Sequence, residues 1–139
     1  SRMADLKDRL VGLNLPVVFD HMGHLSTVRG LSDPGFCAMR DLVADGIGWV
    51  KLSGAYRMTA QQQPPYGDVA PFARELVEAN AERCLWATDW PHPAVVVPMP
   101  NDGDLIDMLV DWVPEEIVRN RILVDNPACL YGFGRDRLQ

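Results

Sequence analysis

Several features that mark whole classes of protein are missing from this sequence. Its three cysteines, Cys37, Cys84 and Cys129, are far apart and form no Cys-x-x-Cys pair, which argues against a disulfide framework. Each lies among apolar neighbours, so we expect small buried side chains in a protein of the reducing cytosol. No apolar run is long enough to cross a bilayer, so no membrane partner is expected.

Positive charge is also scarce. The 139 residues include 13 Lys and Arg against 19 Asp and Glu, which gives a formal net charge of −6 without any block of basic residues. Nucleic acid is therefore not an expected partner. Neither a Gly-x-Gly-x-x-Gly motif nor a P-loop follows any predicted strand, so nothing indicates nucleotide binding.

Four short apolar runs are present at nearly even spacing. They begin near residues 16, 49, 84 and 122, and a helical pattern lies in each interval. This strand–helix repeat predicts an α/β fold with a parallel sheet. An open doubly wound sheet and a (β/α)8 barrel both fit it, but a closed barrel takes about 250 residues. The barrel alternative is thus a partial (β/α)8 TIM barrel of about four βα units, with residues 1–139 as a single domain.

Local signals predict where several helices and loops lie. Apolar spacing predicts a helix over Met3–Leu13, and Asp33 followed by Pro34 predicts the capped start of another. Asn126 before a proline predicts the cap of the last helix. Three glutamines and two prolines in the segment 58–68 predict an irregular loop.

Polar side chains follow three of the predicted strands, at the ends where both architectures place an active site. They are Asp20, His21 and His24 after the first strand, Ser53, Tyr56 and Arg57 after the second, and Asp89 and His92 after the third. A carboxylate or imidazole can activate water, an imidazole can polarise a carbonyl, and an arginine can hold an anion. The pattern therefore predicts a hydrolytic site.

Asp89 is the most informative of these residues. It directly follows an apolar run, where burial raises the pKa of a carboxyl and a neighbouring cation lowers it. A structural alternative exists for each candidate: Asp89 as a turn residue, His21 as a core imidazole, Tyr56 as packing. His21, His24 and Asp89 also suit a zinc or manganese ion as ligands.

Four segments together resemble one family. "VVFDHMGH", "WVKLSGAYR", "CLWATDWPHP" and "ILVDNPACLYGF" are similar, in this order, to the amidohydrolase-related TIM-barrel hydrolases, which include the 2-pyrone-4,6-dicarboxylate lactonases. The resemblance implies that Asp89 activates the attacking water, that His21 contacts a lactone carbonyl and that Arg57 binds a substrate carboxylate. His24 stands where the pyrone-dicarboxylate enzyme has an arginine, so a less anionic lactone is equally expected.

One family feature is missing, and its absence shapes the remaining expectations. The first-strand His-x-His pair does not occur, so the chain resembles the carboxyl-terminal half of such an enzyme. We expect a homo-oligomer or a complementary barrel half as partner, because a lone half exposes strand edges. No cofactor is required on this interpretation, and a divalent metal such as zinc on His21 and Asp89 is the alternative.

The sequence thus predicts a cytoplasmic lactone hydrolase that acts on a small anionic or sugar-derived cyclic ester. Asp89 and His21 are the predicted catalytic residues, and His24, Tyr56, Arg57 and His92 the predicted substrate contacts. Two alternatives stand beside this one. The first is a metal-dependent amidohydrolase or decarboxylase of the same superfamily, and the second is a non-catalytic half-barrel that serves in assembly.

Overall fold

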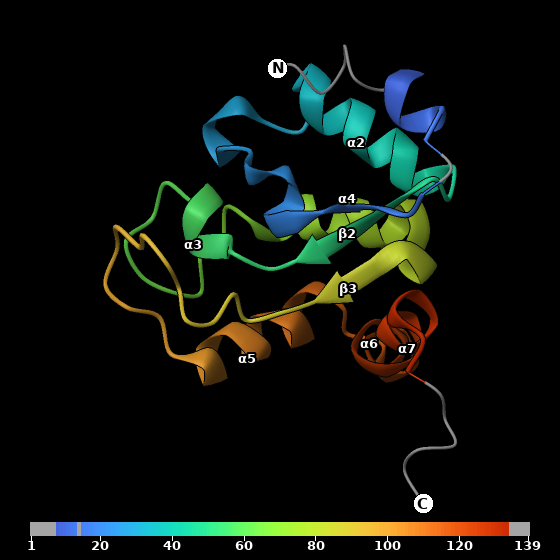
Figure 1. Cartoon of the computed structure of the whole chain (residues 1–139). Coiled ribbons are helices and arrows are strands. Elements are labelled where there is room, and N and C mark those ends of the chain that lie inside the picture. Colours follow the sequence, from blue (N-terminus) through green and yellow to red (C-terminus); the bar gives the residue numbers. More distant parts are fainter. Residues whose placement is uncertain (1–7, 14, 134–139) are drawn as a thin grey trace, which may run out of the picture.

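Three parallel strands form the sheet of this protein, which a computed structural model describes over residues 8–13 and 15–133. They are β1 (Val17–Phe19), β2 (Gly48–Leu52) and β3 (Cys84–Trp86), in the order β1-β2-β3. Val18 pairs with Trp49, and Lys51 pairs with Leu85. Helices alternate with the strands (Figure 1), so the predicted α/β fold and partial barrel are confirmed.

The helices connect and cover these strands. They are α2 (Pro34–Ala44), α3 (Ala55–Met58), α4 (Ala70–Asn80), α5 (Asp102–Trp112), α6 (Glu116–Asn120) and α7 (Asn126–Tyr131), with short turns η1 (Asp20–His24), η2 (Thr27–Arg29) and η3 (Ala81–Arg83). Residues 8–11 are helical, and the start of the predicted Met3–Leu13 helix lies outside the described residues. No helix within the described ranges has the length and apolar character needed to cross a membrane.

Helix α2 begins where its sequence predicts. The Asp33 carboxylate accepts hydrogen bonds from the backbone N–H groups of Gly35 (2.8 Å) and Phe36 (3.2 Å), which have no partner inside the helix. Pro34 takes the first helical position, where a missing N–H costs nothing. The cap fixes the direction in which α2 returns along the sheet after β1.

The hydrophobic core lies between the sheet and the helices α2 and α4, and α4 lies behind the strands in Figure 1. Val50 and Leu52 of β2 are fully buried in this core, where the rings of Phe36 and Phe72 meet edge to face at 5.0 Å. Because side chains alternate along a strand, Lys51 and Ser53 point to the opposite face of the sheet. That face carries the candidate site.

The prediction of a fourth strand near residue 122 is wrong. Residues Arg121–Asp125 form a π-helical turn, η4, and the backbone stays helical from α6 through α7. Ile122 is fully buried, whereas Leu123 and Val124 are exposed, which is the one-sided burial of a helix. A short apolar run alone does not distinguish a strand from a helix.

The expectation of buried cysteines holds for one of the three. Cys84 is fully buried, and burial raises the pKa of its thiol to about 12. Cys37 is half-buried and Cys129 is exposed on α7. Apolar neighbours did not predict burial at Cys129 because adjacent residues of a helix face different directions.

The prediction of Asn126 as a helix cap is also wrong. Asn126 lies inside the continuous helical segment, and its buried side chain reaches the sheet instead. Its Nδ2 group donates hydrogen bonds to the carbonyls of Ala81 (2.8 Å) and Cys84 (2.7 Å). This amide therefore attaches α7 to the start of β3, the strand that leads to Asp89.

Replacing Asn126 by Leu is expected to lower the free energy of unfolding by about 1–3 kcal/mol, because two carbonyls lose their donor in a buried place. Urea denaturation followed by circular dichroism measures this loss. The matched control is Asn120→Leu, at an exposed position of α6, where a change within about 0.5 kcal/mol is expected. Equal losses in the two variants would contradict the attachment.

Candidate active site

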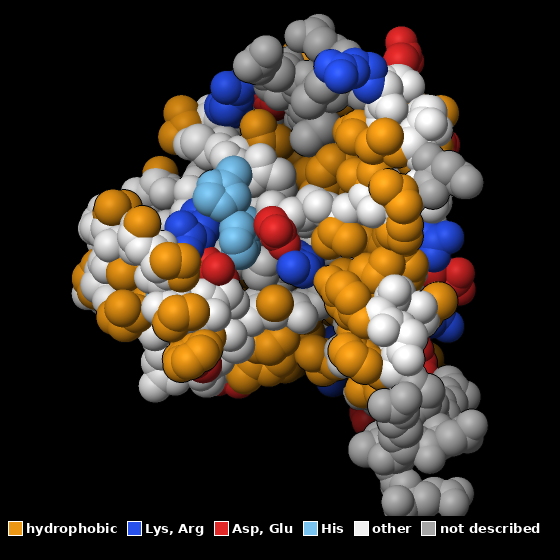
Figure 2. Space-filling model, viewed as in Figure 1, with side chains coloured by type: hydrophobic (Ala, Val, Ile, Leu, Met, Phe, Trp, Pro, Cys, Tyr) orange, Lys and Arg blue, Asp and Glu red, His pale blue; other side chains and the backbone are white. Residues whose placement is uncertain are grey.

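The side chains that follow β1, β2 and β3 meet at one edge of the sheet. Histidine, acidic and basic side chains gather there on one face of the molecule, between apolar areas (Figure 2). A cavity of about 340 Å³ opens among them. It is lined by Asp20, His21, Lys51, Ser53, Ala87, Thr88, Asp89 and Trp90. The structure thus brings together His21 and Asp89, 68 residues apart in the sequence, at the carboxyl ends of their strands.

Asp89 is held by two donors on one of its oxygens. Oδ2 accepts a hydrogen bond from Arg57 Nε at 2.5 Å and another from the Tyr56 hydroxyl, while Oδ1 lies 3.4 Å from His21 Nε2. Burial raises the pKa of this carboxyl, but the two hydrogen bonds and the charges of His21 and Arg57 outweigh it and leave the pKa below its ordinary value. Asp89 is therefore ionised at neutral pH, and its Oδ1, which faces His21, can accept a proton.

His21 faces this oxygen from the end of β1. Its Nδ1 lies 2.9 Å from the Ser53 hydroxyl, and its ring is 4.9 Å from that of the exposed His24. Burial lowers the pKa of His21, and the charge of Asp89 does not offset it fully. The imidazole is thus mainly neutral at pH 7, so it can donate from one nitrogen and accept at the other.

The backbone is left-handed at several of these positions. His21 and Met22 have φ values of 51° and 49°, His24 of 54°, Asp89 of 69° and His92 of 55°. Such a conformation costs about 1–2 kcal/mol for a residue other than glycine. It persists where the surroundings fix it, and such residues cluster at functional sites.

Tyr56 and His92 form a chain of polar contacts behind Asp89. The Tyr56 hydroxyl, which contacts Asp89, lies 3.1 Å from His92 Nδ1, and His92 Nε2 lies 3.0 Å from Asp102 Oδ1. His92 is buried, so it supports Tyr56 from behind and does not line the cavity. Asp102 escaped the sequence analysis because an aspartate in the first turn of a helix is common near a helix start.

Arg57, the predicted anion binder, is engaged inside the protein. Besides Asp89, its guanidinium contacts the carbonyl of Pro93 through Nη2 at 2.8 Å. Arg57 and His24 line a separate, smaller pocket together with Tyr56, Ala94, Val95 and Val96. The candidate residues therefore divide between two neighbouring hollows, one with Asp89 and His21, the other with Arg57 and His24.

Lys51 is the cationic residue that the sequence analysis missed. It lies on β2 and contacts Asp20 Oδ1 through Nζ at 2.7 Å, at the wall of the larger cavity. The signal was present, since a lysine within an otherwise apolar strand is unusual and shares a face with Ser53, two residues on. Trp90 lines the same cavity and is largely exposed.

The described residues do not by themselves make a metal site. His21 and Asp89 offer two ligands, whereas a protein zinc site usually has three or four. No group of three or more His, Cys, Asp or Glu side chains within residues 8–13 and 15–133 is placed to hold an ion. Asp89 is also already paired with Arg57.

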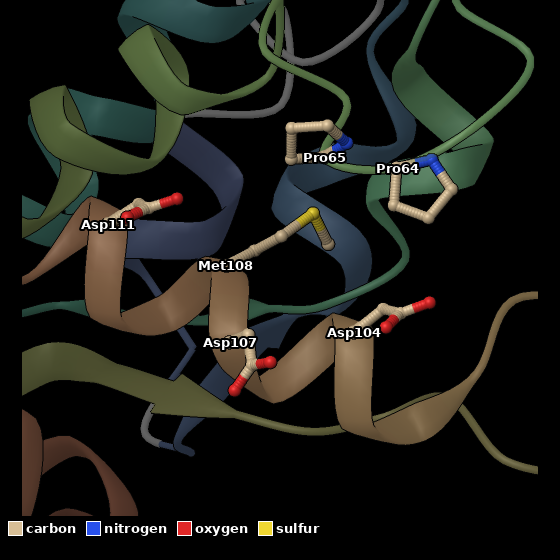
Figure 3. Close-up of a pocket in the computed structure, with 6 residues that line it drawn as sticks. All are labelled: Pro64, Pro65, Asp104, Asp107, Met108 and Asp111. Carbon is tan, nitrogen blue, oxygen red and sulfur yellow. The ribbon is translucent and has the colours of Figure 1, made fainter.

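A further pocket lies away from these residues. Pro64 and Pro65 of the irregular loop pack over α5, beside Met108 and three aspartates, Asp104, Asp107 and Asp111 (Figure 3). The loop predicted over residues 58–68 is confirmed except for Met58, which ends α3, and no helix or strand lies over residues 59–69. None of the predicted site residues lines this pocket, so the chemistry is not expected there.

Comparison with known proteins adds independent evidence. The sequence profile described as amidohydrolase matches residues 3–133. The chain is 45% identical over 129 residues to 4-sulfomuconolactone hydrolase of Hydrogenophaga intermedia, an alignment that covers 91% of this chain and 42% of the relative. It is 35% identical over 137 residues to 2-pyrone-4,6-dicarboxylate hydrolase of Comamonas testosteroni, with 93% and 45% covered.

A solved structure shows the same arrangement of elements. The probable 2-pyrone-4,6-dicarboxylic acid hydrolase of Acinetobacter baumannii superposes with a TM-score of 0.80 at 27% identity, over 94% of this chain and 49% of that one. The chain thus spans less than half the length of these relatives. The profile covers nearly all of the sequence, and the resemblance seen in the four quoted segments is confirmed. This chain belongs to the amidohydrolase family.

Proposed function

We propose that this chain supplies half of the active site of a lactone hydrolase, in which Asp89 activates water. One observation carries the proposal: Asp89 has its Oδ2 held by Tyr56 and Arg57, and its Oδ1 faces His21 in a cavity. A carboxylate oriented in this way is suited to general-base catalysis. The names of the two relatives, both hydrolases of cyclic esters, support the class of substrate.

The geometry gives each residue a role in ester hydrolysis. Asp89 Oδ1 accepts a proton from water as the water oxygen attacks the lactone carbonyl carbon. When the Ser53 hydroxyl donates to His21 Nδ1, the ring proton lies on Nε2 and can stabilise the oxygen that becomes negative. The ring C–O bond then breaks, and the leaving oxygen takes up the proton that Asp89 accepted from water, which returns Asp89 to its ionised form. The product is the ring-opened hydroxy acid, or its keto tautomer when the leaving oxygen is enolic.

The substrate in this proposal is a small lactone that carries an anionic group. Lys51 at one hollow and Arg57 at the other provide positive charge beside the reacting residues. His24, exposed next to Arg57, contributes a polar contact in the smaller hollow. Tyr56 and His92 were predicted to contact the substrate. In this proposal they instead hold Asp89 in its orientation, which is a positioning role.

A complementary barrel half is the proposed partner. The sheet has two edges, β1 and β3, and exposed apolar side chains lie on the same face as the site in Figure 2. Apolar residues such as Leu15, Val96, Tyr131 and Phe133 are exposed in the described part of the chain. Burying them against further βα units would also enclose the cavity and exclude bulk water from the reaction.

The proposal is tested in a complemented enzyme, in which this chain replaces the segment that it matches in the Hydrogenophaga 4-sulfomuconolactone hydrolase. We expect turnover of 4-sulfomuconolactone or another lactone from a panel of anionic and neutral rings. Mass spectrometry in H₂¹⁸O would detect one heavy oxygen in the product. A folded hybrid protein that opens none of these rings would contradict the proposal and favour the non-catalytic assembly module.

A further inference from the structure

We infer that Lys51 binds the anionic group of the substrate while the lactone ring lies against His21 and Asp89. This inference rests on the proposed function and adds to it the group that selects the substrate. The resemblance assigns this role to Arg57 and gives Lys51 no role. The observations that carry it are the position of Lys51, the engagement of Arg57 and the weakness of the Lys51–Asp20 pair.

Position comes first. Lys51 lies on β2 and Ser53 directly follows the last residue of that strand, two positions on, so their side chains project from the same face of the sheet. Ser53 contacts His21, and Lys51 lines the cavity that His21 and Asp89 also line. A lactone whose carbonyl group lies against His21 and Asp89 can therefore place its anionic group on the Lys51 ammonium.

Arg57 is less available than Lys51. Its guanidinium donates to Asp89 at 2.5 Å and to Pro93 at 2.8 Å, and its side chain is 15% exposed beside an Asp89 side chain that is 12% exposed. Removing one partner from a buried ion pair leaves the other charge unpaired, which is strongly destabilising. An anion that took over the Nε or Nη2 donor of Arg57 would break one of these contacts, and loss of the Nε contact would release Asp89 from its fixed orientation.

The ion pair between Lys51 and Asp20 is more exposed to water than the pair between Arg57 and Asp89. Nζ lies 2.7 Å from Oδ1, with the Lys51 side chain 29% exposed and that of Asp20 57% exposed. Exposed pairs contribute little to stability, so Asp20 can return to water when another anion arrives. The hydrogen bond to Asp20 also raises the pKa of Lys51, so the ammonium is charged before substrate binds.

Electrostatics explains why a cation is needed at this point. The acidic side chains of Asp89 and Asp20 make the cavity wall repulsive toward a carboxylate or sulfonate, and among the described residues Lys51 is the Lys or Arg side chain that lines the same cavity. An ammonium on a flexible stem acts as a point charge, which suits a tetrahedral sulfonate as well as a planar carboxylate. We therefore expect Lys51 to distinguish anionic from neutral lactones and to distinguish poorly between the two acids.

The kinetic test compares Lys51→Gln and Lys51→Arg in the complemented enzyme, with 4-sulfomuconolactone and with neutral δ-valerolactone. For the anionic lactone, Lys51→Gln is expected to raise KM about ten- to hundredfold, the effect of losing a charge-assisted hydrogen bond, with kcat changed less than threefold. Lys51→Arg is expected to recover most of the affinity. For the neutral lactone, kcat/KM is expected to stay within about twofold. Equal effects on both lactones, or none, would overturn the inference.

A binding measurement separates this inference from the proposed function. Methanesulfonate is titrated into the complemented enzyme and into its Lys51→Gln variant, and binding is followed by calorimetry and by the side-chain NMR signals of His21. The control Arg74→Gln removes one positive charge from an exposed position of α4. We expect at least tenfold weaker binding in Lys51→Gln alone. Lys51-dependent binding without lactone turnover would refute the hydrolase and keep the anion site, whereas turnover with Lys51-independent binding would refute the anion site.

Discussion

Replacing Asp89 by Asn is expected to lower kcat of the complemented enzyme by about 10²- to 10⁴-fold, the usual contribution of a general base. An asparagine keeps the size of the side chain, and its carbonyl oxygen can still accept from Tyr56 and Arg57 in the place of Oδ2. Its other group is an amide NH₂, which cannot take a proton from water. KM is expected to change little, because the cavity and Lys51 remain. Steady-state kinetics with 4-sulfomuconolactone measures both constants.

The matched control is Asp107→Asn, at an exposed position of α5 that none of the catalytic contacts reaches. Its kcat is expected to stay within twofold of the parent value. Activity of the Asp89 variant within a few fold of the parent would contradict the proposed base. A loss of similar size in both variants would point to a general effect of the lost charge.

The pH dependence of stability tests whether replacing Asp89 by Asn removes a charge that stabilises the folded protein. The folded-state pKa of Asp89 lies below its ordinary value of 3.8, so its ionised form stabilises the folded protein above that pH. This contribution disappears as the pH falls below 3.8 and Asp89 becomes protonated. The difference in unfolding free energy between parent and Asp89→Asn is therefore expected to be larger at pH 7 than at pH 3. Urea titrations at the two values measure it.

The location of the site was predictable because it depends on the direction of the strands. Three apolar runs end in polar residues, and parallel strands bring their carboxyl ends to the same edge of the sheet. His21 and Asp89 come together for this reason alone. The strand–helix repeat alone was therefore enough to predict that His21 and Asp89 lie close together.

The pairing of charges at the site was not predictable in the same way. The sequence offers Arg57 as a free cation, but the fold places it against Asp89 and the carbonyl of Pro93. Lys51 was overlooked because most residues of its strand are apolar. The face of the sheet that the helices do not cover can nevertheless carry charged side chains. Whether Arg57 or Lys51 forms the closer ion pair depends on distances of a few ångström. Such distances cannot be derived from the order of residues in the sequence.

The fourth predicted strand failed for a related physical reason. An apolar run becomes a strand only when a neighbouring strand satisfies its backbone groups. Residues Arg121–Asp125 satisfy theirs within the continuous helix instead, while Asn126 reaches the carbonyls at the start of β3. The segment "ILVDNPACLYGF" was therefore informative about the family, whereas the apolar run within it was misleading about local structure.

Replacing Gly54 by Ala is expected to displace His21 and to lower kcat at least tenfold, since misplacing a reacting group by about 1 Å can cost 10²-fold. Gly54 follows Ser53 and has φ +61°, and a Cβ there would lie 2.8 Å from His21 Nδ1 and 2.9 Å from its Cβ and Cγ. Real Cβ atoms essentially never approach so closely, so the imidazole must move. His21 cannot move freely, because its own backbone is left-handed and its ring contacts Ser53.

Two other glycines separate the clash from the backbone strain. Gly30 also has a positive φ (+73°), but no atom lies within 4 Å of the position that a Cβ would take. At Gly67, φ lies outside the left-handed region and again no atom lies within 4 Å of the Cβ position. Gly30→Ala is expected to lower the free energy of unfolding by about 1–2 kcal/mol without changing kcat, and Gly67→Ala to change neither. Gly54→Ala is expected to lose both stability and kcat. If Gly54→Ala lost stability alone, as Gly30→Ala does, then the position of the His21 ring would not limit the reaction and its role at the carbonyl would have to be abandoned.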